Sequence, residues 1–216
     1  MSATPPLTDT LARRAVERTV AERMAELAGS MQRVVEATYE LVERTGTVDP
    51  PMRQILARTG LSTQAFYRLF RSKDELMLVL LDDGRRRLVA HLERRMARAG
   101  SPEARVRAWV EGVMAQAADP RAASRTRPFV ASEDRIAEAF PEEHAASVDQ
   151  LVDLLVAPLA ELAGGRRTAV VRGDAEAVYR LTLATLRDHL LSRQRPAPAT
   201  VEHLVGFCLR GVGAPS

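Results

Sequence analysis

Hydrophobic positions follow a helical period along most of the chain, with apolar residues three or four positions apart in segments that Gly and Pro separate. Beyond residue 50 this pattern predicts helices over 52–59, 63–70, 72–98, 103–118, 121–139, 142–163, 174–194 and 198–212. Within these segments, Pro128 predicts an interruption and Pro158 predicts a kink. The pattern as a whole predicts a helical chain.

The first fifty residues contain two further periodic segments. Residues 10–28 form a charged, weakly amphipathic segment, and we expect this helix to end at Gly29 and Ser30. A second helix follows and stops at Gly46. The first segment therefore precedes the more strongly apolar part of the chain as a separate helix.

These segments group into three parts. We expect a partly helical N-terminal extension over 1–29, a small helical domain over 30–76 and a larger helical domain over 77–216. Ser72 and Glu75 form a capping box that opens the long helix joining the two domains.

Composition agrees with a helical fold and excludes several functional classes. The 216 residues are 46% apolar, 27% charged and only 4% aromatic, a balance that favours an all-α fold over sheets. The longest apolar run, 76–81, is far shorter than the roughly 20 residues of a membrane span. The N-terminus also lacks a secretory pattern, so we expect a cytoplasmic protein. The single cysteine, Cys208, excludes an internal disulfide and a cysteine-based zinc site, and we expect neither metal nor cofactor.

Charge is distributed unevenly although the net charge is only +3. The window 50–73 contains no acidic residue, whereas arginines elsewhere alternate with Asp and Glu. The basic residues of this window are Arg53, Arg58, Arg68, Arg71 and Lys73. A basic window without an acidic counterweight is typical of a surface that binds nucleic acid.

The same window has the dimensions of a helix-turn-helix, with Gly60 in the turn. At 100° per residue, the polar side chains of the second helix occupy about 140° of arc and the apolar ones fill the rest. The polar set is Thr63, Gln64, Tyr67, Arg68 and Arg71. Hydroxyl, amide and guanidinium groups are those that contact base edges and phosphates in a major groove.

The spacing of this region resembles the signature of the TetR family of bacterial transcriptional regulators. The matching string is Ile55-x-x-x-Thr59-Gly60-Leu61-Ser62-x4-Tyr67-x2-Phe70-x2-Lys73-x2-Leu76, preceded by a similar first helix that ends at Gly46. The resemblance covers roughly residues 33–78. It implies a three-helix DNA-binding domain followed by a larger helical domain that binds an effector and dimerises.

Candidate DNA-binding residues follow from the resemblance together with the helix geometry. It implies that Thr63 and Gln64 face bases, that Tyr67 contacts phosphate and that Lys73 holds the backbone. The candidate set is Arg53, Ser62, Thr63, Gln64, Tyr67, Arg68 and Lys73. Lys73 also lies in the first turn of a helix, where free amides and the helix dipole favour an anion.

The chain departs from the family pattern at several positions. Leu69 stands where the family often has His, Leu56 stands where a small residue is usual, and Pro50 and Pro51 replace the usual Thr or Ser. The two prolines remove amide donors that could meet phosphate. The arginines of 10–28 could reach phosphates or an adjacent groove, or glutamates could balance them on a solvated helix.

For the larger domain, the resemblance implies a small and largely apolar effector. The candidate effector-binding residues are Trp109, Val113, Phe129, Leu155 and Tyr179, and the alternative is that they are plain core. The last two helices carry wide apolar faces that predict a homodimer through a four-helix bundle, or else pack on the subunit's own core. The candidate interface residues are Leu186, Leu190, Val201, Leu204, Val205, Cys208 and Val212.

The sequence therefore predicts a sequence-specific transcriptional regulator that binds double-stranded DNA at a palindromic operator. We expect it to act as a repressor that a small-molecule effector releases from this operator. The alternative is a helical protein-interaction module that does not bind DNA. An enzyme is disfavoured because the four histidines lack metal-binding spacing, and the chain has no glycine-rich phosphate loop or nucleophile elbow. We accordingly expect no catalytic residues.

Overall fold

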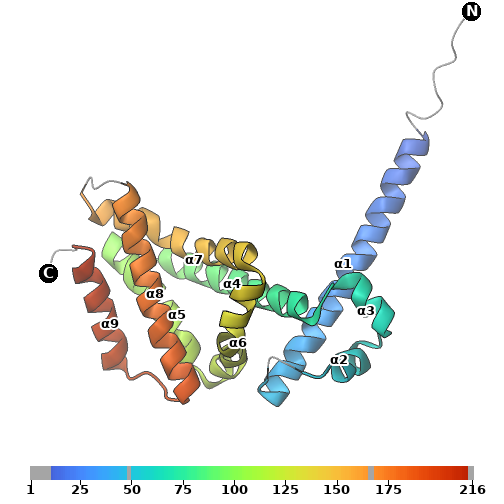
Figure 1. Cartoon of the computed structure of the whole chain (residues 1–216). Coiled ribbons are helices and arrows are strands. Elements are labelled where there is room, and N and C mark those ends of the chain that lie inside the picture. Colours follow the sequence, from blue (N-terminus) through green and yellow to red (C-terminus); the bar gives the residue numbers. More distant parts are fainter. Residues whose placement is uncertain (1–10, 48–49, 165–167, 214–216) are drawn as a thin grey trace, which may run out of the picture.

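The computed structural model describes residues 11–47, 50–164 and 168–213, and within these ranges all regular structure is helical. The helices are α1 (Leu11–Thr45), α2 (Met52–Thr59), α3 (Thr63–Leu69), α4 (Lys73–Met96), α5 (Pro102–Ala118), α6 (Pro120–Ala139), α7 (Pro141–Leu162), α8 (Thr168–Ser192) and α9 (Pro198–Gly211). Figure 1 shows α1, α2 and α3 at one end of the molecule and α8 and α9 at the other. The expected all-α architecture is confirmed.

The N-terminal region differs from the expectation, because α1 is one continuous helix of 35 residues. The predicted end at Gly29 and Ser30 is wrong. A glycine inside a helix costs only about 1 kcal/mol relative to alanine, and the Ser30 hydroxyl accepts a hydrogen bond from Arg33 (2.9 Å) one turn later. Side chains 12–28 are exposed, and Figure 1 shows this half of α1 extending away from the rest of the molecule.

The buried apolar residues form two clusters that α4 connects. The first cluster holds α1, α2 and α3 together around Ile55, Phe66 and Phe70, and the first half of α4 packs into it. The second cluster joins the end of α4 to α5, α6, α7, α8 and α9, with Ala123 and Val130 contributed by α6. Phe129 and Ile136 of α6 belong to the first cluster, so α6 links the larger domain to the smaller one.

Two prolines lie inside helices. The structure continues α6 through Pro128, so the expected interruption there is wrong, and it continues α7 through Pro158. Both prolines are buried, and their packing offsets the backbone hydrogen bond that proline removes. Within the described residues, no helix is long and apolar enough to span a bilayer.

Candidate functional site

The turn between α2 and α3 is built by local sequence. Gly60 ends α2 in the left-handed conformation (φ 69°), and its amide donates to the Leu56 carbonyl at 2.9 Å. Glycine adopts this backbone conformation without the penalty that a Cβ would bring. Ser62 then caps α3, because its hydroxyl accepts a hydrogen bond from the Ala65 amide at 3.1 Å. Gly60 and Ser62 thus fix the angle at which α3 leaves α2.

One face of α3 anchors the helix in the protein. Phe66 and Phe70 are fully buried, with ring centroids 5.4 Å apart, and they pack in the cluster around Ile55. The Tyr67 ring meets the edge of Phe66 at 5.5 Å, although 53% of Tyr67 is exposed. The apolar side of α3 therefore holds the opposite side toward solvent.

The opposite face of α3 carries the residues expected to contact DNA. Thr63, Gln64, Tyr67 and Arg68 are all exposed on it, as the helical period predicts. Arg53 and Arg68 make no ion pair with any residue that the structure describes, whereas many arginines elsewhere pair with Asp or Glu. Their charges are thus available to phosphate.

The start of α4 lies beside this face. The Ser72 hydroxyl accepts from the Glu75 amide at 3.0 Å, as a capping box requires, but the Glu75 carboxylate accepts from the Arg71 amide. Lys73 is half-buried in the first turn. At the start of α2, Pro51 supplies no side-chain cap, which agrees with the loss of donors expected at Pro50 and Pro51.

Two of the four arginines in residues 10–28 pair with acids on the same helix. Arg13 pairs with Glu17 at 3.0 Å, and Arg18 pairs with Glu22 at 3.9 Å, both one turn apart. Such exposed pairs contribute little to stability, typically below about 0.5 kcal/mol. This arrangement favours the solvated-helix interpretation of the extension over an arm that contacts DNA.

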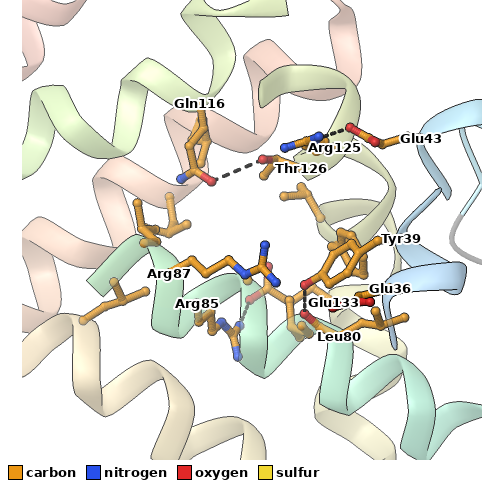
Figure 2. A pocket seen from close by; sticks show the side chains of 18 of the residues that line it. Glu36, Tyr39, Glu43, Leu80, Arg85, Arg87, Gln116, Arg125, Thr126 and Glu133 are labelled. Atoms are coloured by element: carbon orange, nitrogen blue, oxygen red, sulfur yellow. Dashed lines mark hydrogen bonds and ion pairs between the residues drawn. The ribbon is translucent and has the colours of Figure 1, made fainter. Parts of the chain in front are cut away.

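A cavity of about 420 Å³ lies between the two domains, lined by α1, α4, α5, α6, α7 and α8. Figure 2 shows Gln116 of α5 and Thr126 of α6 on one side of the open centre, and Arg85 and Arg87 of α4 on the other. Much of the lining is apolar, from Leu80, Leu81, Leu88, Phe129, Val130, Leu151, Leu183 and Leu186. Polar and charged side chains complete the lining, and a partly apolar cavity of this size is typical of a small-molecule site.

The structure places only part of the expected effector set at this cavity. Phe129 and Tyr179 line it, but Trp109, Val113 and Leu155 do not, because they lie fully buried in the core of the larger domain. The indole nitrogen of Trp109 donates to the Leu151 carbonyl at 3.1 Å, so its polar tip is already satisfied. The cavity is therefore not beside Trp109 as expected, although the Trp109 ring contacts Tyr179 at 6.5 Å between centroids.

A buried charge cluster at this cavity was not expected from the sequence. Arg85 is only 8% exposed, and its Nη2 donates to the Glu133 carboxylate and lies 2.9 Å from His144 Nε2. Burial raises the pKa of Glu133, but the hydrogen bond with His144 and the charge of Arg85 bring it below the usual value. The only signal in the sequence is that Arg85 falls at an apolar position of α4, four residues after Leu81.

The smaller domain reaches the cavity through Tyr39 of α1. The Tyr39 hydroxyl donates to the Leu80 carbonyl at 2.5 Å, and its ring contacts Phe129 of α6 at 5.6 Å between centroids. Nearby, Arg125 of α6 forms an ion pair with Glu43 of α1 (Figure 2). Side chains of both domains therefore meet at the cavity wall.

Six of the seven residues expected at a dimer interface are buried within one subunit, and Val201 is half-buried. Leu186, Leu190, Leu204, Val205, Cys208 and Val212 belong to the core of the larger domain, and Val201 packs against it. A fully covered side chain such as Val205 has no surface left to give a partner. This corrects the expected interface set, and Leu186 instead lines the cavity. The exposed large apolar residues of these helices are Val170, Leu181, Leu191 and Phe207.

Comparison with known proteins agrees with this geometry. Residues 34–80 match the family model of bacterial regulatory proteins, tetR family, which covers α2, α3 and the adjoining parts of α1 and α4. No curated protein sequence matches the chain.

Solved structures share its fold along most of its length. The fatty acid degradation regulator FadR from Bacillus halodurans superposes with a TM-score of 0.64 at 16% identity, covering 86% of this chain and 97% of that one. FadR from Bacillus subtilis, in complex with stearoyl-CoA, gives 0.61 at 13% identity, with 84% and 96% covered. A transcriptional regulator from Rhodococcus sp. Rha1 gives 0.60 at 20% identity, with 84% and 96% covered. Residues 34–80 therefore match the TetR family of bacterial transcriptional regulators in sequence, and most of the chain is similar in fold to solved transcriptional regulators.

Proposed function

We propose that this DNA-binding regulator is a cytoplasmic repressor, without catalytic activity, that recognises a palindromic operator through α3. The observation that carries the proposal is the outer face of α3, which presents Thr63, Gln64 and Tyr67 beside Arg68. Arg53 and Arg68 pair with no described acid, whereas Arg58 of the same basic window pairs with Glu40. Amide and hydroxyl groups read base edges, while Arg53, Arg68 and Lys73 supply the charge that phosphates require. Ser62 has a capping role, and its exposure leaves its hydroxyl within reach of a phosphate.

We further propose that a small effector occupies the cavity and releases the protein from DNA. The cavity is lined by Tyr39 of α1, which belongs to the smaller domain, and by Arg85 of α4, the helix that follows α3. A ligand that fits only one arrangement of these helices shifts the molecule toward that arrangement. The stearoyl-CoA complex of the Bacillus subtilis FadR supports ligand binding by this fold.

A homodimer would place two copies of α3 on one operator. The outer faces of α8 and α9 expose Leu181 (36%), Leu191 (46%) and Phe207 (56%), and pairing them about a two-fold axis would cover this apolar surface. Two recognition helices would then lie about 34 Å apart, or a multiple of this, matching an inverted repeat.

A nuclease footprint on the DNA upstream of the protein's own gene tests this function. We expect protection of an inverted repeat whose half-sites are separated by about one helical turn or a multiple of it. Absence of any protected site at low salt, where electrostatic binding is strongest, would contradict the proposal and would favour a protein-interaction module.

A further inference from the structure

The start of α4 carries two acids directly after the lysine expected to hold the DNA backbone. Asp74 and Glu75 follow Lys73 in the first turn of this helix. Figure 1 shows α4 leading from α3 into the larger domain, so these acids lie where the DNA-binding face meets that domain. Because screening at physiological salt acts over about 8 Å, a carboxylate on the adjacent residue would oppose the attraction of Lys73 for phosphate.

The two acids have different partners. The Glu75 carboxylate turns back and accepts a hydrogen bond from the Arg71 amide, within the cap of α4. The Asp74 carboxylate instead forms an ion pair with Arg135 of α6, whose Nη1 lies 3.0 Å from Oδ1. The acid next to Lys73 is therefore neutralised by a helix of the larger domain.

Buried neighbours hold Arg135 beside the start of α4. Ile136, the next residue of α6, is only 1% exposed and packs in the cluster of the smaller domain. Phe129 anchors α6 in the same cluster earlier in the helix. The ion pair itself is exposed, and exposed pairs contribute little to stability. The packing of α6 therefore fixes the pair, and the effect left to the pair is electrostatic.

From these contacts we propose that Arg135 raises the affinity for DNA by neutralising Asp74, which leaves Lys73 free of a competing charge beside the DNA backbone. This inference rests on the proposed DNA-binding function and gives a part in it to a residue outside the segment 34–80 that matches the family model. Arg135 acts through Asp74, so it is a positioning residue.

Fluorescence anisotropy of the full chain with two duplexes tests the inference, one from the DNA upstream of the protein's own gene and one of random sequence. Arg135→Ala should weaken binding to both duplexes about threefold to tenfold at low salt, because Asp74 then carries an uncompensated charge. Asp74→Asn should tighten binding by a similar factor. The protein with both substitutions loses one charge of each sign and should bind within about twofold of wild type.

The opposite signs of the two single substitutions distinguish this role from a structural one. A pair that only oriented α4 would give weaker binding when either partner was replaced. Arg187→Ala is the matched control, since it breaks the ion pair of the neighbouring residue Asp134 with α8 (2.8 Å) and should stay within about twofold of wild type.

Three results would overturn the inference: Arg135→Ala binds like wild type, Asp74→Asn also weakens binding, or the protein with both substitutions remains as weak as Arg135→Ala. If any of these occurs while wild type binds the upstream duplex, the role of Arg135 is wrong and the DNA-binding function stands. If wild type binds neither duplex, the proposed function fails and the inference fails with it.

Discussion

At the scale of single residues, the outer face of α3 depends on neighbouring residues, whereas the Arg85 cluster depends on segments far apart in the chain. The exposure of Thr63, Gln64 and Tyr67 follows from a period of 3.6 and from the buried Phe66, all within one turn or two of sequence. Arg85 gains its role only where α4, α6 and α7 meet, because Glu133 and His144 come from distant segments. No spacing of residues along the sequence predicts the contact of Arg85 with Glu133 and His144.

Substitutions of Gln64 and Lys73 are expected to weaken DNA binding in different ways. Gln64→Ala should cost roughly 1–3 kcal/mol at the operator and relax base preference, because an amide side chain reads base edges. Lys73→Ala should weaken binding to all sequences alike and lower the salt slope by about one ion. Titrations on operator and random duplexes at several salt concentrations separate the two. Equal losses of Gln64→Ala on both duplexes would show that Gln64 does not read bases.

The ion pair between Arg85 and Glu133 makes the free energy of unfolding depend on pH. The pKa of Glu133 in the folded protein lies below its ordinary value, so its ionised form stabilises the fold at neutral pH. This contribution is present above the ordinary carboxyl pKa and is lost as pH falls through the lower, folded value. We expect Glu133→Gln to unfold more easily at pH 7 by about 3 kcal/mol, since it leaves Arg85 buried without its counter-charge. Denaturant unfolding at pH 7 and at about pH 3 checks this, and an equal loss at both values would contradict it.

At the scale of elements, most helices could be predicted, and the errors share one cause. Gly29 and Pro128 were read as breaks, yet both lie inside helices. Propensity is a weak term of about 1 kcal/mol for glycine, and neighbouring turns and packing override it. Gly and Pro therefore predict the ends of α2 and α4 correctly. They predict false helix ends at Gly29 and Pro128, where the helical sequence continues on both sides.

The continuity of α1 makes Gly29 a site for stabilisation. An added Cβ would meet only the end of Arg33 at 3.7 Å, an ordinary contact. Gly29→Ala should therefore raise helix content and stabilise the protein by about 0.5–1 kcal/mol. Circular dichroism with thermal melting measures both effects. Destabilisation would mean that Gly29 ends a helix in the left-handed conformation, as the sequence suggested.

At the scale of the whole molecule, the division into two linked domains could be predicted, but the outer surface of the larger domain could not. Val205 and Cys208 have the periodicity of an interface and lie in the subunit core instead. Periodicity shows that a face is buried without showing whether the same chain or a second copy buries it. The cavity was missed for a similar reason, because its walls come from six helices of both domains.

Dimerisation through α8 and α9 is tested by charge on their outer faces. Leu191→Arg and Phe207→Arg should shift a dimer toward monomer in light scattering, since each would place an unpaired charge in a desolvated patch. Val16→Arg, on the exposed half of α1, is the matched control and should leave the dimer intact. A monomeric wild-type protein at micromolar concentration, or a dimer that both variants leave unchanged, would contradict this interface.

The central claim is that the outer face of α3 binds duplex DNA. Fluorescence anisotropy with a duplex from the DNA upstream of the protein's own gene tests this claim most directly. The proteins compared are wild type, Arg68→Glu and Arg98→Glu. The two variants make the same charge change, one on α3 and the other near the far end of α4. We predict that wild type binds, that Arg68→Glu weakens binding by about tenfold or more, and that Arg98→Glu stays within about twofold. Equal affinities for all three proteins, or no binding by wild type at low salt, would contradict the claim.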